Sequence, residues 1–514
     1  MALLRSVATI GSFTMGSRIL GFVRDTLFAA VLGAGVAADC FIIAFRLPNF
    51  LRAMFAEGAF NAAFVPLYSR LLSGPDGETR AAYFAGQIGT LLTLVVTCFV
   101  ALVMVFTNEA MHVLAPGFTA DPAKFALAVE LTRLTFPYLA YISLVSLMGA
   151  ILNAHHRFAA PAGTPIVMNL ILIGALIGPA RHFEPAHAQA VAVTIAGMAQ
   201  FLWLAVSLQR AGLSLRLYRP RVSPEIRRFF TLLMPAVLGA GVYQVNVFVD
   251  MILSSLLPSG AVSFLFYADR LNQLPLGVIG IAVSTALLPI LSRQLAKGDM
   301  EQALHSQNRA LEGALLLTLP AAAALVTLPE TIIGVLFQHG AFTAGDTRAT
   351  ADALAMFALG LPAFVATKVF TPGFHAREDT RTPVRLAIIA MIANLVVALS
   401  LLWSLEHVGL AIATTVAAWV NVGQLGLTSH RRGYFVPDTR LITRSLRLVL
   451  ATAVMVVVLL GLEYLARPFF ARDLLWRIGT LLFLVGSGGL AFLLAALATG
   501  AIGLADLKRL LRFG

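Results

Sequence analysis

Arginine side chains that lie within otherwise apolar stretches are the residues of this sequence with the clearest potential for chemistry. Arg18, Arg24 and Arg52 lie among aliphatic runs near the start of the chain, and Arg270 lies in a similar run near its middle. Removing a guanidinium from water costs several kcal/mol unless partners compensate for the lost hydration. Arginine binds phosphate and carboxylate groups through two parallel hydrogen bonds. These four arginines therefore predict a site that binds an anion.

Further polar side chains accompany the arginines at helical spacing. Arg18 and Asp25 are seven residues apart, so they lie on one face of a helix. Pro48, which has no N–H, is expected to break the second helix and to leave carbonyl groups free to line a cavity. A second polar face, with residues in steps of three, is formed by Arg46, Asn49 and Arg52. The remaining candidates for lining or gating the same space are Asp39, Glu57 and Asp269.

Buried ion pairs are the alternative explanation for these charges. Asp25 can neutralise a neighbouring arginine such as Arg24, and Glu57 can neutralise Arg52. Some of these pairs are expected in one conformational state of the protein. We favour anion binding because the arginines form a cationic cluster larger than packing requires.

Asp250 has two interpretations, and the sequence leaves both open. Its carboxylate could bind a cation together with Asn394 and Thr414, or it could bond to a neighbouring helix. The chain contains no GxxxxGK[ST] phosphate loop, no HExxH and no GxSxG motif. Its two cysteines lie in separate apolar runs, whereas structural metal sites usually need three or four ligands. We therefore expect a transporter rather than an enzyme, with no cofactor and no resident metal.

Composition indicates which elements hold these side chains. The chain has 514 residues, of which 59% are hydrophobic and 12% are charged, and its mean hydropathy is +0.86. Soluble domains are about 45–50% apolar and about 25% charged. This composition excludes a soluble enzyme, a secreted disulfide scaffold and a disordered chain. It predicts an all-α polytopic membrane protein.

Fourteen stretches satisfy the requirement of about 20 mainly apolar residues for a spanning helix. They are residues 5–33, 37–72, 80–107, 124–154, 158–180, 186–209, 225–257, 262–295, 301–327, 347–375, 383–405, 408–430, 441–465 and 473–499. Basic residues fix their direction, because Lys and Arg are enriched on the cytoplasmic side. One set of loops, together with both termini, holds 24 Lys and Arg residues, and the opposite set holds seven. Both termini are therefore predicted to be cytoplasmic, and the net charge of +12 requires no nucleic acid.

An internal repeat divides the helices into two groups. The segment AFNAAFVPLYSR at 59–70 aligns with AVSTALLPILSR at 282–293, and VLAPGFT at 113–119 aligns with VLFQHGAFT at 335–343. Each unit spans six helices, so both units have the same orientation in the membrane, as in many transporters that work by alternating access. The predicted domains are an N-lobe at 1–212, a C-lobe at 213–432, and two further helices with a cytoplasmic C-terminus at 433–514.

Four long segments resemble one family of membrane transporters. They are GSRILGFVRD at 16–25, ADCFIIAFRLPNFLRAMFAEGAFNAAFVPLYSR at 38–70, YADRLNQLPLGVIGIAVSTALLPILSR at 267–293 and VLFQHGAFT at 335–343. They closely resemble the MurJ/MviN lipid II flippases of the multidrug/oligosaccharidyl-lipid/polysaccharide exporter superfamily. The resemblance extends through at least the first twelve helices, and the last two fit the family's two additional helices.

The resemblance implies both an activity and a set of site residues. The activity is movement of lipid II, the undecaprenyl-diphosphate-linked disaccharide-pentapeptide, from the cytoplasmic to the outer leaflet by alternating access. The family's important cavity arginines match Arg18, Arg24, Arg52 and Arg270, and its important aspartate on the second helix matches Asp39. The last two helices are expected to form a groove for the isoprenoid tail. The alternative function is transfer of another polyprenyl-linked oligosaccharide.

The resemblance also implies a location, partners and an energy source. We expect a monomer in the bacterial inner membrane, with membrane lipids around it and the cell-wall synthesis machinery as a possible partner. Each negative charge moved outward gains about 2.3 kcal/mol per 100 mV, so the membrane potential can drive export of an anionic headgroup. Some family members resemble sodium-binding transporters with a second carboxylate one turn beyond the residue matching Asn394. Ala398 occupies that position here, which argues against sodium and leaves the coupling ion open.

Overall fold

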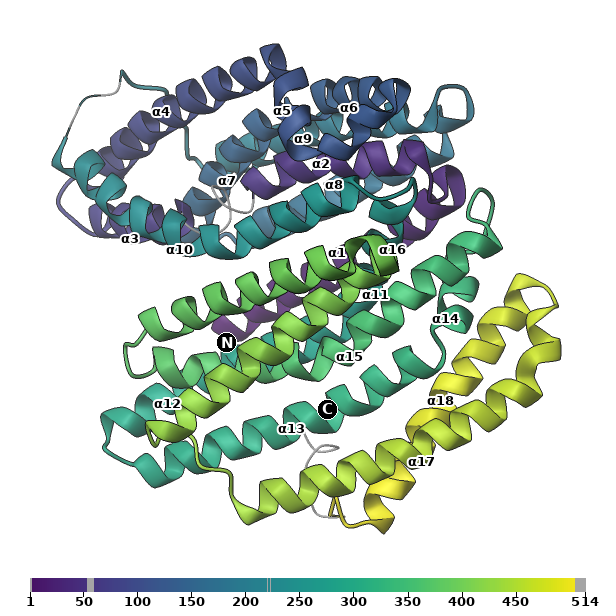
Figure 1. Cartoon of the computed structure of the whole chain (residues 1–514). Coiled ribbons are helices and arrows are strands. Elements are labelled where there is room, and N and C mark those ends of the chain that lie inside the picture. The colour runs from purple at the N-terminus through teal and green to yellow at the C-terminus, as the bar shows by residue number, and fades with distance from the viewer. Residues whose placement is uncertain (1, 53–59, 220, 222, 504–514) are drawn as a thin grey trace. The chain divides into compact units, whose positions relative to one another are not determined.

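The computed structural model describes residues 2–52, 60–219, 221 and 223–503 (Figure 1). Helices dominate this part of the chain, and no β-strand occurs in it. Ten helices among the described residues are long and apolar enough to cross a membrane. The protein is therefore an all-α polytopic membrane protein, as predicted, whereas the number of fourteen spans stays a prediction.

Internal packing divides the chain into two compact units. The first extends to Ser263 and includes His339–Phe342, and the second comprises Phe264–Gln338 and the residues from Thr343 onward. This division differs from the predicted lobe boundary at 212–213, because residues 224–255 pack within the first unit. The division reflects contacts rather than the sequence repeat, so the three predicted domains stay predictions.

The first unit is built mainly of long helices joined by short turns. They are α1 (Ala2–Leu32), α2 (Val36–Leu51), α3 (Phe60–Leu72), α4 (Gly77–Val105), α5 (Thr107–Leu114), α6 (Pro122–Thr135), α7 (Tyr138–Ala154), α8 (Ala159–Ile177), α9 (Pro185–Arg210) and α10 (Pro224–Ser255). Within this unit α1 packs against α8, α2 against α6, and α3 against α10. Stacked and edge-on rings join α3, α4 and α10, with Phe64 5.6 Å from Phe84 and Phe60 5.7 Å from Phe229 between ring centroids.

The second unit contains most of α11 and all later helices. They are α11 (Ala261–Pro275), a π-helical segment (Leu276–Gly280), α12 (Ile281–Ala296), α13 (Met300–Thr327), α14 (Pro329–Leu336), α15 (Ala344–His375), α16 (Arg381–Arg431), α17 (Thr439–Phe470) and α18 (Leu474–Ala498). The buried helix α15 packs against α13 and α16. The hairpin of α17 and α18, yellow in Figure 1, packs against α13 through α17.

The 51-residue helix α16 contains the predicted break between two of the apolar stretches. Glu406 has a φ of 48° and a ψ of −127°, which is not a helical conformation. Close packing accompanies the break, because a Cβ added to Gly409 would lie 2.7 Å from the carbonyl oxygen of Leu401. The predicted stretches 383–405 and 408–430 thus meet at the point where the helix changes direction.

The sequence repeat is visible in the local structure of both units. The eight-residue helices α5 and α14 each follow a long apolar helix, and they begin 222 residues apart. Asp121 then caps α6, and Thr343 caps α15, again 222 residues apart. The aligned segments therefore fold into the same order of elements.

The turn at His339–Phe342 docks on the end of α1 in the first unit. The N–H of Ala341 donates to the carbonyl of Ala30 at 2.8 Å. Gly33 and Gly340 have φ values of +67° and +58°, and a Cβ on Gly340 would lie only 2.2 Å from that same carbonyl oxygen. The glycine in the VLFQHGAFT segment is therefore required for close backbone approach.

Candidate functional site

Asp39 forms the buried centre of a polar cluster in the first unit. Its Oδ2 accepts hydrogen bonds from the N–H of Gly260 at 2.7 Å and from Lys124 Nζ at 3.3 Å. Its Oδ1 accepts from the N–H and the hydroxyl of Ser263, at 3.0 and 2.7 Å. The side chain is 0% exposed. A single carboxylate thus joins α2 to α6 and to the beginning of α11, and we call these residues, with Ser259, the Asp39 cluster.

Two physical effects favour this position for a carboxylate. The first N–H groups of a helix have no partner within the helix, and the helix dipole makes that end partially positive. Gly260 and Ser263 provide such N–H groups at the beginning of α11. Gly260 has a φ of +100°, which a side chain would disfavour. Asp39 therefore acts as a cap supplied by a distant helix.

Lys124 neutralises Asp39 inside the protein. It is 5% exposed, and its ammonium also donates to Ser259 Oγ at 3.1 Å and lies 4.1 Å from the centroid of the Phe118 ring. Asp121 caps α6 through the N–H of Lys124 at 3.2 Å and so fixes the first turn. Sequence reasoning gave Lys124 no role beyond its place at the start of the predicted stretch 124–154, among the seven basic residues of the basic-poor side. One signal in the sequence could have indicated its importance: Lys124 lies on the predicted outer side of the membrane, where Lys and Arg residues are scarce.

Arg24 is held by two different partners on α1 and α8. Its Nε and Nη2 donate to Asp25 Oδ1 at 3.0 and 2.6 Å, and its Nη1 donates to Asn169 Oδ1 at 3.1 Å. Asn169 is 6% exposed and donates to the carbonyl of Ser17 at 2.9 Å. The predicted pairing of Asp25 with Arg24 is thus present, and Asn169 is a further residue that fixes the guanidinium.

The other predicted residues of α1 and α2 have different surroundings. Arg52 Nε donates to Asn49 Oδ1 at 2.9 Å, so these two share a face as predicted. Arg18 is exposed and Arg46 is partly buried, and neither forms an ion pair with any residue that the structure describes. Glu57 lies outside the described residues.

The expectation for Pro48 is wrong in its detail. Pro48 lies inside α2, which continues to Leu51, and the side chain is buried. The carbonyl of Ala44, one turn before it, accepts a hydrogen bond from the hydroxyl of Thr135 on α6 at 3.0 Å. The group that proline leaves free therefore joins two helices instead of lining a cavity.

The remaining predicted residues are distributed over both units. In the second unit, Arg270 lies over the Phe266 ring at 5.0 Å, and Gln273 donates to Asp269. In the first unit, Asn246 donates to Asp250 at 3.2 Å. The other two members of the predicted cation site, Asn394 and Thr414, belong to the second unit, and the Thr414 hydroxyl donates to its own helix. A common cavity for the arginines and a cation site at these residues stay predictions.

A second charged network lies between α13 and α17 in the second unit. Glu312 accepts hydrogen bonds from Arg309 and Arg444, and its carboxylate lies 3.5 Å from Arg440 Nε. Arg309 also donates to Asp438, which caps α17. We call these residues the Glu312 network. Sequence reasoning missed it because partners such as Glu312 and Arg444 are 132 residues apart.

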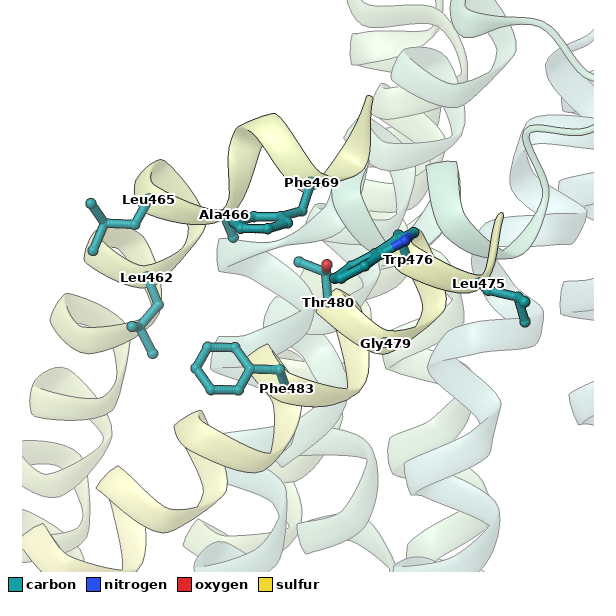
Figure 2. A pocket seen from close by; sticks show the side chains of 9 residues that line it. All are labelled: Leu462, Leu465, Ala466, Phe469, Leu475, Trp476, Gly479, Thr480 and Phe483. Carbon is teal, nitrogen blue, oxygen red and sulfur yellow. The ribbon is translucent and has the colours of Figure 1, made fainter. Parts of the chain in front are cut away.

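An apolar hollow of about 680 Å³ lies between α17 and α18 (Figure 2). Its lining includes Leu462, Phe469, Trp476 and Phe483, and Thr480 is the residue there with a side-chain hydroxyl. The guanidinium of Arg472 lies 4.8 Å from the centroid of the Trp476 ring. A hollow of this kind suits hydrocarbon, and the predicted tail groove at these helices stays a prediction.

No group of three or more His, Cys, Asp or Glu side chains that could hold a metal ion occurs among the described residues. The site consists instead of guanidinium, ammonium, carboxylate and amide groups on membrane helices. Such groups bind anions and form or break ion pairs between helices.

Comparison with known proteins identifies relatives along almost the whole chain. The model of the family described as lipid II flippase MurJ matches residues 28–479. A probable lipid II flippase MurJ of Rhizobium meliloti is 41% identical, over 100% of this chain and 97% of its own length. The lipid II flippase MurJ of Burkholderia cenocepacia is 32% identical, over 85% of this chain and 86% of its own.

Solved structures give the same result for the fold. A structure described as lipid II flippase MurJ in an inward closed conformation has a TM-score of 0.79 and 27% identity, covering 95% of this chain and 97% of that one. An inward-facing multidrug resistance MATE family transporter has a TM-score of 0.67 at 14% identity, covering 83% of this chain and 97% of its own, and shows the shared fold alone. The chain is thus a multi-pass transporter rather than an enzyme, and it belongs to the lipid II flippase MurJ family.

Proposed function

We propose that this protein moves the lipid-linked peptidoglycan precursor lipid II from the cytoplasmic to the outer leaflet of the bacterial inner membrane. Both termini are cytoplasmic, and the protein alternates between inward-open and outward-open states. The relatives named lipid II flippase, two of which match this chain at 41% and 32% identity, support this substrate. The substrate carries a diphosphate and peptide carboxylates, which are the groups that arginine binds with the best geometry.

One observation carries the proposal of an anion site: positive charge on α1 and α2 exceeds the carboxylates that neutralise it. Asp39 is neutralised by Lys124, and Asp25 bonds to Arg24. Within the described residues, Arg18 and Arg46 therefore keep their charge without an ionic partner. Ion pairing alone therefore does not account for these two charges. We assign Arg18, Arg24, Arg52 and Arg270 to the substrate headgroup.

In the proposed orientation the Asp39 cluster is the outer gate. The chain crosses the membrane once through α1, so the beginning of α2, with Asp39, lies on the outer side. Lys124 and Ser259 follow the third and seventh predicted stretches and lie on that side as well. Opening this gate separates a buried carboxylate from a buried ammonium. After separation, the carboxylate of Asp39 needs water or substrate as a new hydrogen-bonding partner. Opening therefore requires a source of free energy that offsets the loss of the ion pair.

The membrane potential supplies a direction for transport. With the cytoplasm negative, each negative charge that moves outward gains about 2.3 kcal/mol per 100 mV. A headgroup with several anionic groups gains several times this amount, which is enough to separate a buried ion pair. Collapse of the potential in vesicles should therefore slow outward movement, and an unchanged rate would contradict this energy source.

Depletion of the protein in its host, with lipid-linked intermediates labelled separately in each leaflet, tests the substrate. We expect lipid II to accumulate on the cytoplasmic side. If lipid II still reaches the outer leaflet while another polyprenyl-linked glycan accumulates, the substrate assignment moves to that glycan. Single substitutions R18A, R24A, R52A and R270A should each abolish complementation at normal membrane abundance. Full complementation by most of them would remove the anion site from the mechanism.

A further inference from the structure

A second hollow, of about 800 Å³, lies within the first unit beside the beginning of α10. Leu91 of α4 and Ile226, Phe230 and Met234 of α10 provide its apolar lining. The last three recur every four residues and therefore share one face of the helix. Ile226 is buried at the base of this face, whereas Phe230 and Met234 are 38% and 55% exposed, so protein leaves these two side chains uncovered. From Ile226 to Met234 the helix rises by about 12 Å, close to the depth of one hydrocarbon leaflet.

Two guanidinium groups belong to the same hollow. Arg221 and Arg227 both line it, and both are exposed. Neither forms an ion pair within the described part of the chain, and the nearby carboxylate of Glu225 lies 3.5 Å from Arg80 instead. The hollow thus combines two available positive charges at one end with an apolar wall along α10.

The segment that leads into α10 is held firmly against α4. The hydroxyl of Thr90 donates to the carbonyl of Tyr218 at 2.8 Å, and the rings of Tyr83 and Tyr218 are 4.9 Å apart. A Cβ on Gly86 would lie 2.1 Å from the carbonyl oxygen of Arg216, so glycine is needed for this approach. Arg221 follows Tyr218 by three residues. The anchored contacts thus end three residues before the arginine.

We propose that this hollow binds an anionic phospholipid of the cytoplasmic leaflet. Arg221 and Arg227 bind its phosphate, and the acyl chains lie along Phe230 and Met234. Besides the two arginines, Thr231 is the lining residue with a polar side chain, and its hydroxyl donates to the carbonyl of Arg227. A glycopeptide headgroup would find few hydrogen-bonding partners here, so the site suits a phospholipid and not the transported substrate. Its assignment to the cytoplasmic leaflet rests on the orientation proposed above.

Native mass spectrometry of the purified full chain tests the site without reference to orientation or transport. Phosphatidylglycerol is added in steps, and phosphatidylethanolamine serves as the neutral comparison. We expect preferential binding of phosphatidylglycerol, weakened roughly tenfold or more in the double variant R221Q/R227Q. The control R210Q/R219Q removes two exposed arginines of the same region that do not line the hollow, and it should bind as the parent does.

A second variant separates loss of the site from loss of the fold. T231W fills the hollow and leaves both arginines in place, so it should lose phosphatidylglycerol binding at an unchanged thermal midpoint. Equal binding of the two lipids by the parent chain, or equal losses in R210Q/R219Q, would overturn the proposal. In a last experiment, undecaprenyl diphosphate competes with phosphatidylglycerol for the protein. If it displaces phosphatidylglycerol and binds more tightly at the same arginines, the hollow is a substrate site and the proposal is wrong. None of these outcomes depends on whether the chain transports lipid II.

Discussion

The Asp39 cluster and the Glu312 network both join helices through charge, but they differ in burial and in redundancy. The first contains one carboxylate and one ammonium, 0% and 5% exposed. The second contains three arginines and two carboxylates; Glu312 at its centre is only 11% exposed at the side chain, but Arg440 and Asp438 are 47% and 37% exposed. A lone buried pair is costly to break because either partner alone is an uncompensated charge. A partly exposed network loses one member at little cost, because water and the other members replace it.

This difference indicates different roles for the two regions. The Asp39 cluster depends on one buried ion pair, which has no second carboxylate or ammonium among the described residues to replace a lost partner, and this suits the gate proposed above. The Glu312 network keeps α17 attached to α13 whichever of its pairs is present at a given moment, which suits a permanent joint. The two regions therefore differ in how many partners can replace a lost charge, and this difference can be tested by substitution.

The largest expected effect is that of D39A. It leaves the Lys124 ammonium buried without a carboxylate and removes the cap of α11, so it should destabilise the protein by about 3–5 kcal/mol. Thermal denaturation of the purified protein in detergent measures this loss. D39N keeps the shape and part of the hydrogen bonding, and it should lose less. A D39A midpoint equal to that of the parent chain would show that the cluster carries no charge-dependent stability.

The reverse substitution, K124M, should have a smaller effect. Asp39 keeps three hydrogen bonds, from Gly260 and from two groups of Ser263, so we expect a loss of about 2 kcal/mol. The double variant D39N/K124M removes both charges and should be more stable than the sum of the single losses predicts. Additive losses in this cycle would mean that the two side chains do not interact.

The Glu312 network should respond weakly to substitution. E312Q removes the negative charge that three arginines share and keeps one acceptor oxygen, and we expect a loss of about 1 kcal/mol that shrinks further in high salt. R440Q, at its exposed edge, serves as the control and should be close to neutral. A loss for E312Q as large as that for D39A would end the distinction between a gate and a joint.

The smallest effect on stability is expected for substitution of Asp379, and this effect should depend on pH. Hydrogen bonds from the side chain and backbone of Thr382, together with Arg432, lower the pKa of Asp379 from 3.8 to about 2. Because the folded-state pKa is the lower one, the carboxylate stabilises the fold fully above about pH 4, and this contribution is lost as pH falls toward 2. The thermal midpoints of the parent chain and D379N should therefore differ slightly at pH 6 and converge near pH 2. A difference that persists at the lowest pH would exclude the carboxylate as its source.

The fold class and the charged helices could be predicted from sequence because both depend on local composition. Long apolar stretches predict spanning helices, and arginines at helical spacing predict shared faces, as Arg52 and Asn49 confirm. The break in α16 was predicted from the same apolar pattern. Segments as long as the one at 38–70 also predicted the family, which the comparisons confirm.

The partners of individual charges could not be predicted, because they depend on packing between distant helices. Lys124 meets Asp39 across 85 residues, and Asn169 meets Arg24 across 145. Nothing in the neighbourhood of either residue in the sequence specifies the other. The carbonyl of Ala44, which Pro48 leaves free, shows the same limit. It was expected to line a cavity, but it accepts a hydrogen bond from the hydroxyl of Thr135 on α6.

Cys40 gives the chain a natural reporter of gate opening. Its thiol is 0% exposed, lies beside Asp39 and donates to the carbonyl of Lys124 at 3.3 Å. If the cluster opens as the proposed outer gate, the rate at which a water-soluble reagent alkylates Cys40 measures how often it opens, with no engineered label and no substituted residue.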